Sequence, residues 1–255
     1  MQIVMIHGQN HRGSTYHIGK MVADALGGTV TEFFLPRDFG SFCVGCNNCF
    51  MKDESLCPHH AKLKPITDAM DDADVLILTS PVYVYHATGA MKAFLDHYGY
   101  RWMVHRPEPA MFHKQAVCVA TAAGAGMRST LRDMQDSLFF WGVPKVYRIG
   151  KAVHAVSWAH VSETQRRSCA KQADAIAKKI LRKKKVHPGL KTKGFFHIMR
   201  MIQKSGSWNE TDTRYWKEKG WIKSGCACSP SSGEIVSFTI FTPEWRINTA
   251  TSRPM

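Results

Sequence analysis

Long hydrophobic runs are missing from this 255-residue sequence. No run reaches the roughly 18 apolar residues that a membrane-spanning helix needs. The first residues, MQIVMIHGQN, lack the basic segment, long apolar core and cleavage site of a secretory signal peptide. We therefore expect a cytoplasmic protein with no transmembrane segment, in a reducing compartment where structural disulfides are rare.

Acidic residues are also scarce, with 20 Asp and Glu against 34 Lys and Arg and a formal net charge of +14. None occurs between Asp174 and Glu210, an interval that contains the segment KKILRKKKVHPGLKTKG (178–194). Such a basic block can bind nucleic acid or an anionic surface nonspecifically. A solvated helix end followed by a linker is the simpler explanation. Since no nucleic-acid-binding motif accompanies the block, we expect no specific nucleic-acid partner.

What the sequence does contain is a regular alternation of apolar runs and amphipathic segments. The apolar runs suited to buried strands are 2–7, 29–35, 73–80, 115–121 and 144–150. Segments with helical spacing of apolar residues are 14–26, 60–71, 87–98, 126–142 and 162–183. Because parallel strands need helical crossovers, this alternation predicts an α/β fold, a parallel sheet with helices on both faces.

Composition divides the chain into three expected regions. The alternating pattern defines an α/β domain over 1–185, and a basic, aromatic helical extension follows over 186–225. In the extension, the segment 193–208 has apolar residues on one helical face and basic residues opposite, which suits docking against its own domain or a dimer mate. The tail over 226–255 shows no clear element.

The loop GQNHRGST connects the first strand to the first helix. Ligands of parallel α/β sheets bind at the carboxyl ends of the strands, where this loop begins. Its glycines permit a tight turn, and the free N–H groups and dipole of the following helix favour a phosphate. The lysine of the nucleoside-triphosphate loop is absent, so a monophosphate fits better. A capped turn without a ligand is the alternative.

Two further loops are expected at the same edge of the sheet. The segment SPVYVYHATGAMKAFLDH (80–97) offers the flat rings of Tyr83 and Tyr85, although core or rim tyrosines would explain them equally. TAAGAG (121–126) has no bulky side chain and lets the backbone approach a ligand. The three loops together predict one pocket with a phosphate end and a planar-ring end, which suits flavin mononucleotide.

Four cysteines crowd the segment SFCVGCNNCFMKDESLCPH (41–59), and they are Cys43, Cys46, Cys49 and Cys57. Closely spaced thiolates on a loop match the way proteins hold [4Fe–4S] clusters. The spacing also permits zinc bound by four sulfurs. Free thiols and a redox disulfide are the remaining alternatives.

The sequence resembles the flavodoxin-like NAD(P)H-dependent FMN reductases, and among them most the iron–sulfur flavoproteins. The features that carry the resemblance are GQNHRGST, ADVLILTSPVY with MKAFLDH behind it, and the spacing C-x2-C-x2-C-x7-C. The similarity covers residues 1–185, and RYWKEKGWI (214–222) resembles a tail found in some members. It implies a flavodoxin-like three-layer fold with a five-stranded parallel sheet in the order 2-1-3-4-5.

The resemblance implies an FMN-dependent NAD(P)H oxidoreductase of the flavin or quinone reductase type. It also implies a homodimer that passes electrons, through a cysteine-bound [4Fe–4S] cluster, to a small-molecule or protein acceptor. Hydride transfer to flavin N5 needs no side-chain acid or base, so no catalytic residue is expected. A non-enzymatic flavodoxin-like carrier serving a protein partner is the alternative.

The resemblance also assigns site residues. The implied metal ligands are Cys43, Cys46, Cys49 and Cys57. The expected FMN-binding residues are Gln9, Asn10, His11, Arg12, Ser14, Thr15, Pro81, Val82, Tyr83, Tyr85, Thr121, Ala122, Ala123, Gly124 and Gly126.

Overall fold

The computed structural model of the chain describes residues 1–183, 186–206 and 209–222. These residues all belong to one compact unit, 1–223. The expected tail over 226–255 therefore lies outside the described residues, and the division into three regions stays a prediction.

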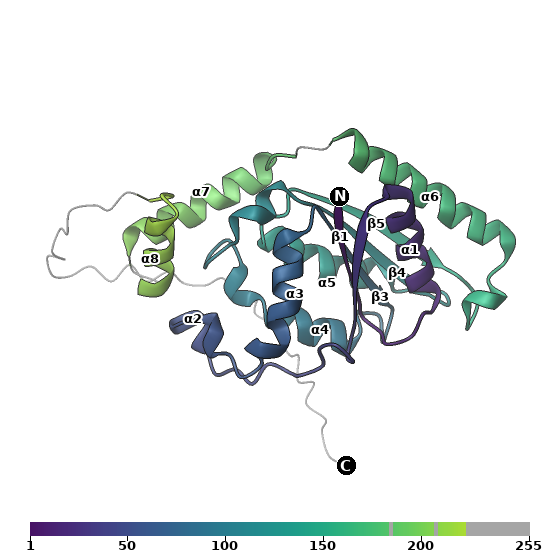
Figure 1. Cartoon of the computed structure of the whole chain (residues 1–255), viewed down its shortest axis with the longest axis horizontal. Coiled ribbons are helices and arrows are strands. Elements are labelled where there is room, and N and C mark those ends of the chain that lie inside the picture. Colours follow the sequence, from purple (N-terminus) through teal and green to yellow (C-terminus); the bar gives the residue numbers. More distant parts are fainter. Residues whose placement is uncertain (184–185, 207–208, 223–255) are drawn as a thin grey trace, which may run out of the picture. The chain divides into compact units, whose positions relative to one another are not determined.

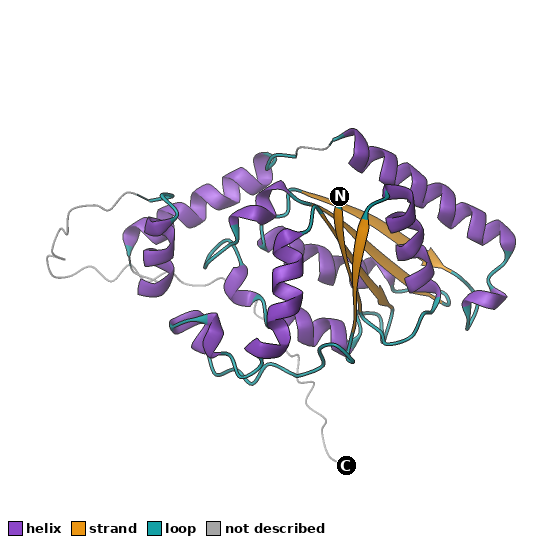
Figure 2. Ribbon diagram, viewed as in Figure 1, coloured by secondary structure: helices purple, strands orange, loops and turns teal. Residues whose placement is uncertain are grey.

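A five-stranded parallel sheet forms the centre of the fold (Figure 2). Its strands lie in the order β2-β1-β3-β4-β5, with every neighbouring pair parallel, as the sequence predicted. The strands are β1 (Gln2–His7), β2 (Thr29–Phe34), β3 (Val75–Pro81), β4 (Gln115–Ala122) and β5 (Lys145–Ala152).

Helices cover both faces of the sheet (Figure 1). On one face pack α1 (Ser14–Leu26) and α6 (Glu163–Arg182), against the side chains of Ile3 and Met5. The intervening residues Val4 and Ile6 point to the opposite face, because successive side chains of a strand alternate. The helices over that face are α3 (His60–Asp72), α4 (Gly89–Asp96) and α5 (Met127–Phe140). This arrangement confirms the predicted three-layer flavodoxin-like fold.

Short helical turns connect the main elements. The cysteine-rich segment contains α2 (Asn48–Met51) and the 3₁₀ turn η1 (Glu54–Leu56). The other 3₁₀ turns are η2 (Gly99–Arg101), η3 (Pro109–His113) and η4 (Trp158–His160).

The C-terminal extension consists of α7 (Leu190–Ser205) and α8 (Glu210–Glu218). It forms a separate small core in which Met103, Met199, Trp216 and Ile222 are buried. Trp216, which is fully buried, donates a hydrogen bond from Nε1 to the carbonyl oxygen of His105 over 2.5 Å. The extension therefore packs against the segment that follows η2.

Substituting Trp216 tests how firmly this small core holds. We expect Trp216→Ala to lower the free energy of unfolding by about 3–5 kcal/mol, since it leaves a large cavity and an unpaired carbonyl. The control is Ile198→Ala, at a half-exposed position of α7. It should change the free energy of unfolding by no more than about 0.5 kcal/mol. Urea unfolding followed by circular dichroism measures both, and equal effects would contradict the packing described.

Candidate functional site

A cleft of about 270 Å³ opens where β1, β3 and β4 end. The strand register explains why these ends meet, because His7 lies opposite Thr79 and Pro81 lies opposite Thr121. The cleft is lined by His7, Gln9, His11, Gly13, Ser14, Thr15, Tyr16, Thr79, Pro81, Val82, Tyr83, Thr121, Ala122, Ala123, Val153, Ala155 and Val156.

The loop after β1 is fixed to β3 and α4 through the backbone of Gly8. Its N–H donates to the carbonyl oxygen of Thr79 over 2.7 Å, and its carbonyl oxygen accepts from the Thr88 hydroxyl over 2.6 Å. A Cβ at Gly8 would lie 2.9 Å from that hydroxyl oxygen and 3.1 Å from the Thr79 carbonyl oxygen. Only glycine allows this close approach.

Further hydrogen bonds join the three loops to one another. The N–H of Val82 donates to the carbonyl oxygen of Thr121 over 2.9 Å, and the hydroxyls of Thr15 and Thr121 are 2.5 Å apart. Across the cleft, Gln9 Nε2 donates to the hydroxyl of Tyr83. The structure thus brings together the loops that the sequence placed around one pocket.

The amino end of α1 supplies unpaired backbone donors to the cleft. Its N-cap is Gly13, which has no side chain that could cap the helix, and Ser14 and Thr15 open the first turn. The first N–H groups of a helix have no partner inside it, and the helix dipole adds partial positive charge there. Both features suit a phosphate group.

The tyrosine loop makes a tight turn at the cleft's mouth. Tyr83 and His86 exchange two backbone hydrogen bonds, 2.9 and 3.0 Å long, around Val84 and Tyr85. Both central residues have positive φ, 48° and 65°, a conformation that normally selects Gly or Asn. Holding such residues costs on the order of 1–3 kcal/mol each, and a hydrogen bond of 3.0 Å between His86 Nδ1 and Asp133 Oδ2 helps to hold the turn.

Most of the expected FMN-binding residues line the cleft. They are Gln9, His11, Ser14, Thr15, Pro81, Val82, Tyr83, Thr121, Ala122 and Ala123. The structure places the others outside the lining, namely Asn10, Arg12, Tyr85, Gly124 and Gly126. Among these, Arg12 lies over the ring of Tyr16, 5.3 Å from its centroid. Gly126, at φ +94°, packs directly against Val82 and Tyr85. The flavin contacts of all the expected residues, inside and outside the lining, stay predictions.

Sequence reasoning missed residues that reach the cleft from two places. Val153, Ala155 and Val156 follow β5, whose carboxyl end lies at the same edge of the sheet. That position was a usable signal. The sequence signal for His7 was weaker, because this residue ends an apolar strand and has the pattern of a core residue.

His7 is a buried, neutral imidazole at the base of the cleft. Its Nδ1 lies 3.0 Å from the Thr79 hydroxyl oxygen, and its ring stacks on Phe34 with centroids 4.5 Å apart. Its Nε2 has no hydrogen-bond partner among the described residues. Burial lowers the pKa of His7 to about 4, and the positive charge of Arg12 contributes.

The lowered pKa of His7 makes stability depend on pH. Between about pH 6.5 and about 4 the unfolded chain binds a proton that folded His7 does not, so stability falls as pH falls, by up to about 3 kcal/mol. His7→Gln should remove this contribution while leaving those of other groups. Denaturant unfolding across this range measures it, and parallel pH profiles for the two proteins would refute it.

The four cysteines of segment 41–59 line a second, small cavity of about 30 Å³. Cys43 and Cys46 are exposed, whereas Cys49 and Cys57 are half-buried. Burial raises the pKa of the Cys49 thiol to about 11, and the charges of the other three cysteines raise it further. The four thiols line one cavity, and their chemistry fits a cluster or zinc.

Two histidines lie beside Cys57. The Sγ of Cys57 and one nitrogen each of His59 and His97 lie within 4.8 Å of one another. His97 Nδ1 donates to the Ala93 carbonyl oxygen over 2.7 Å, and its Nε2 lies 2.9 Å from His59 Nδ1. Sequence reasoning missed His97 because it is far from the cysteines along the chain.

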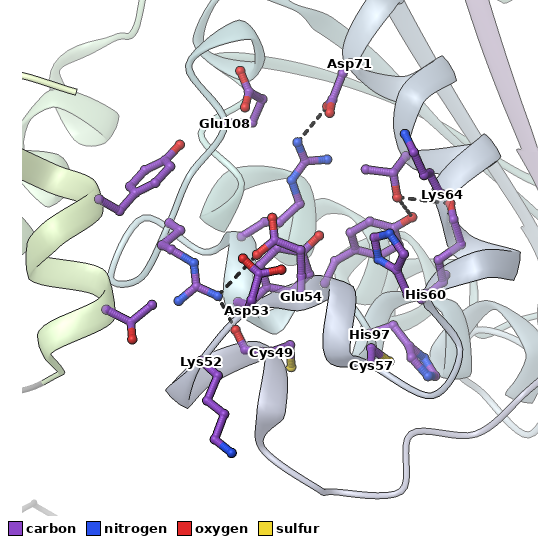
Figure 3. A pocket seen from close by; sticks show the side chains of 18 of the residues that line it. Cys49, Lys52, Asp53, Glu54, Cys57, His60, Lys64, Asp71, His97 and Glu108 are labelled. Atoms are coloured by element: carbon purple, nitrogen blue, oxygen red, sulfur yellow. Dashed lines mark hydrogen bonds and ion pairs between the residues drawn. The ribbon is translucent and has the colours of Figure 1, made fainter. Parts of the chain in front are cut away.

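A third cavity, of about 370 Å³, lies among α3, η2, α8 and the cysteine segment (Figure 3). Cys49 and Cys57 belong to its wall as well as to the wall of the small cysteine cavity. Charged side chains line it in pairs, such as Arg101 and Asp71, whose Nη2 and Oδ1 are 2.7 Å apart. None of its lining residues belongs to the cleft at the sheet edge.

Comparison with known proteins identifies the family of this chain. The model of the NADPH-dependent FMN reductase family matches residues 1–157, more than half of the sequence. The chain belongs to this family. It is therefore an oxidoreductase that uses FMN and NAD(P)H, as the resemblance predicted.

Individual relatives agree with this membership. An iron–sulfur flavoprotein of Archaeoglobus fulgidus is 27% identical over 185 residues, which cover 71% of this chain and 80% of the relative. Another iron–sulfur flavoprotein, from Methanocaldococcus jannaschii, is 28% identical over 145 residues, covering 53% and 70%. The NAD(P)H:quinone oxidoreductase of Methanothermobacter marburgensis shares the fold, with a TM-score of 0.52, 17% identity, and coverage of 69% and 95%.

The predicted resemblance to iron–sulfur flavoproteins is thereby confirmed. Over the part of the chain that the structure describes, no helix combines the length and the hydrophobicity needed to cross a membrane.

Proposed function

We propose that this protein is an NAD(P)H-dependent FMN reductase that passes electrons from its flavin through a cysteine-bound [4Fe–4S] cluster to an acceptor. The observation that carries the proposal is that one chain presents both a cleft suited to FMN and a cavity lined by four thiols. The names of the two curated relatives support the cluster. Bound FMN supplies the redox chemistry, since it accepts a hydride and can release electrons singly.

The chain's own residues bind and orient the flavin in this proposal. The uncapped amino end of α1, with Ser14 and Thr15, holds the phosphate. Pro81, Val82, Tyr83 and the 121–126 loop would flank the ring system. His7, neutral at pH 7, offers Nε2 as a single donor or acceptor below it.

The four cysteines form the metal centre in this proposal. Cys49 and Cys57 are the half-buried ligands, whereas Cys43 and Cys46 close the site from the exposed side. Gly45, with φ +66°, lets the loop turn between the first two ligands. A cytoplasmic location, where thiols stay reduced, suits such a site.

We further infer a homodimer. Exposed apolar side chains surround both sites, which is unusual for a monomer. Phe42 and Val44 flank the first cysteine, while Val84, Tyr85 and Val156 surround the mouth of the cleft. A second copy of the chain would bury these groups, and sedimentation equilibrium tests the inference.

Anaerobic purification tests the proposed function. The protein should be coloured, should contain FMN, iron and sulfide, and should oxidise NAD(P)H with an artificial acceptor. A colourless protein that takes up no FMN would overturn the flavin assignment. A flavin-containing protein that reacts with a ferredoxin-type donor but with neither NADH nor NADPH would instead indicate an electron carrier.

Substituting one cysteine separates the metal centre from the flavin. Cys46→Ser should abolish stoichiometric iron and sulfide but leave FMN binding unchanged, because the two cavities share no lining residue. Cys169→Ala, on the buried side of α6, is the control and should retain the iron. The iron and FMN contents of each protein are measured. Stoichiometric zinc, or no metal, in the wild-type protein would contradict the cluster assignment.

A further inference from the structure

Helix α8 makes direct hydrogen bonds to the backbone of the cysteine segment. Asn209 Nδ2 donates to the carbonyl oxygen of Phe50 over 2.7 Å. Two residues along, the hydroxyl of Thr211 donates to the carbonyl oxygen of Met51 over 2.9 Å. Residues about 160 positions apart along the sequence are thus joined at the end of α2.

Arg106 adds a charged donor at the same place. Its Nη1 lies 3.2 Å from the carbonyl oxygen of Phe50, and its Nη2 donates to the carbonyl oxygen of Cys49. The side chain is buried and forms an ion pair with Asp212 of α8, whose Oδ1 is 2.6 Å away. Its Nη2 also lies 3.5 Å from Oε2 of Glu54.

Asp212 connects this cluster of bonds to the core of the extension. It is fully buried, and its Oδ2 lies 2.7 Å from Nδ1 of His105. His105 in turn packs edge-on against the ring of Phe50, with centroids 4.9 Å apart. The same ring lies close to Gly99, where a Cβ would come within 2.9 Å of Phe50 Cζ.

These contacts satisfy a need of the segment itself. The last carbonyl groups of a helix have no partner inside it, and α2 has only four residues. Three consecutive carbonyls, of Cys49, Phe50 and Met51, receive their donors from Arg106 and α8. Bonds from a guanidinium are about twice as strong as neutral ones. Cys49 is thereby held firmly, whereas Cys43 and Cys46 lie on exposed chain.

We propose that α8 and Arg106 position Cys49 as a metal ligand, so that the C-terminal extension is a working part of the metal centre. Asn209, Thr211 and the Arg106–Asp212 pair are its positioning residues. The inference rests on the proposed function, because it takes the four cysteines as ligands. Outer contacts of this kind orient ligands and tune a metal centre.

Two paired variants of α8 test the proposal in the full-length protein. Asn209→Ser keeps a residue able to cap α8 but is too short to reach Phe50, and Thr211→Val removes only a hydroxyl. In the double variant, iron should be released to a chelator about ten times faster than in the wild type. The control is Thr213→Val, whose hydroxyl donates to Gln203 of α7 over 3.2 Å and not to the cysteine segment. It should release iron at the wild-type rate.

The reduction potential provides a readout that loosened packing alone does not produce. Asp212→Asn removes a negative charge close to the metal centre, so the potential of the cluster should rise and the spectrum of its reduced state should change. Thr213→Val should leave both unchanged. Unaltered potential and iron release in the Asn209→Ser/Thr211→Val and Asp212→Asn proteins would overturn the proposal.

Hydrogen exchange separates failure of this inference from failure of the proposed function. If wild-type protein contains no iron, the cluster assignment falls. The positioning role is then decided in the metal-free protein, where amide exchange across 49–52 and labelling of Cys49 should be about tenfold faster in the double variant. Equal rates in the double variant and wild type would overturn the role of α8 whatever the metal content.

Discussion

The parallel pairing of β1, β3 and β4 is the constraint on which the flavin cleft depends. It puts three strand ends at one edge of the sheet, and each end contributes a different kind of group to the cleft. Helix α1 contributes unpaired donors, the turn after β3 contributes aromatic rings, and the loop after β4 contributes bare backbone. Gly8 fixes their spacing because its N–H and carbonyl are both bonded to the neighbouring elements. Nothing larger than glycine fits between them.

A second constraint acts on the cysteine segment, which leaves the sheet after β2 and returns at α3. Such a segment has few backbone partners of its own. The structure supplies them from Arg106, which lies within the family match at 1–157, and from α8, which lies beyond it. The flavin cleft is therefore built at the edge of the sheet, whereas the backbone of the cysteine segment is held in part by the extension. Under the proposed function, this division lets one common fold carry an additional metal centre.

The sequence predicted the sheet well because both of its faces are buried. Runs such as VLIL (75–78) can then be apolar throughout, and the strand order was implied by the resemblance to flavodoxin-like reductases. The three loops were equally predictable, since strand ends define the binding edge. Contacts between residues far apart in the sequence could not be predicted. Nothing in the local pattern relates Asp212 to Arg106 or His97 to Cys57, because these contacts depend on how the extension and α4 pack. The position of His7 in the cleft was missed for another reason, because a residue at the end of an apolar strand has the pattern of a core residue.

Titration of flavin-free protein with FMN and with riboflavin is the most direct test of the central claim that the three strand ends bind one mononucleotide. The fluorescence of FMN should be quenched on binding until one molecule is bound per chain. Riboflavin, which lacks the phosphate, should bind on the order of 100-fold more weakly because charge-assisted bonds at the amino end of α1 are lost. Equal affinity for the two flavins, or no saturable binding of FMN, would contradict the account.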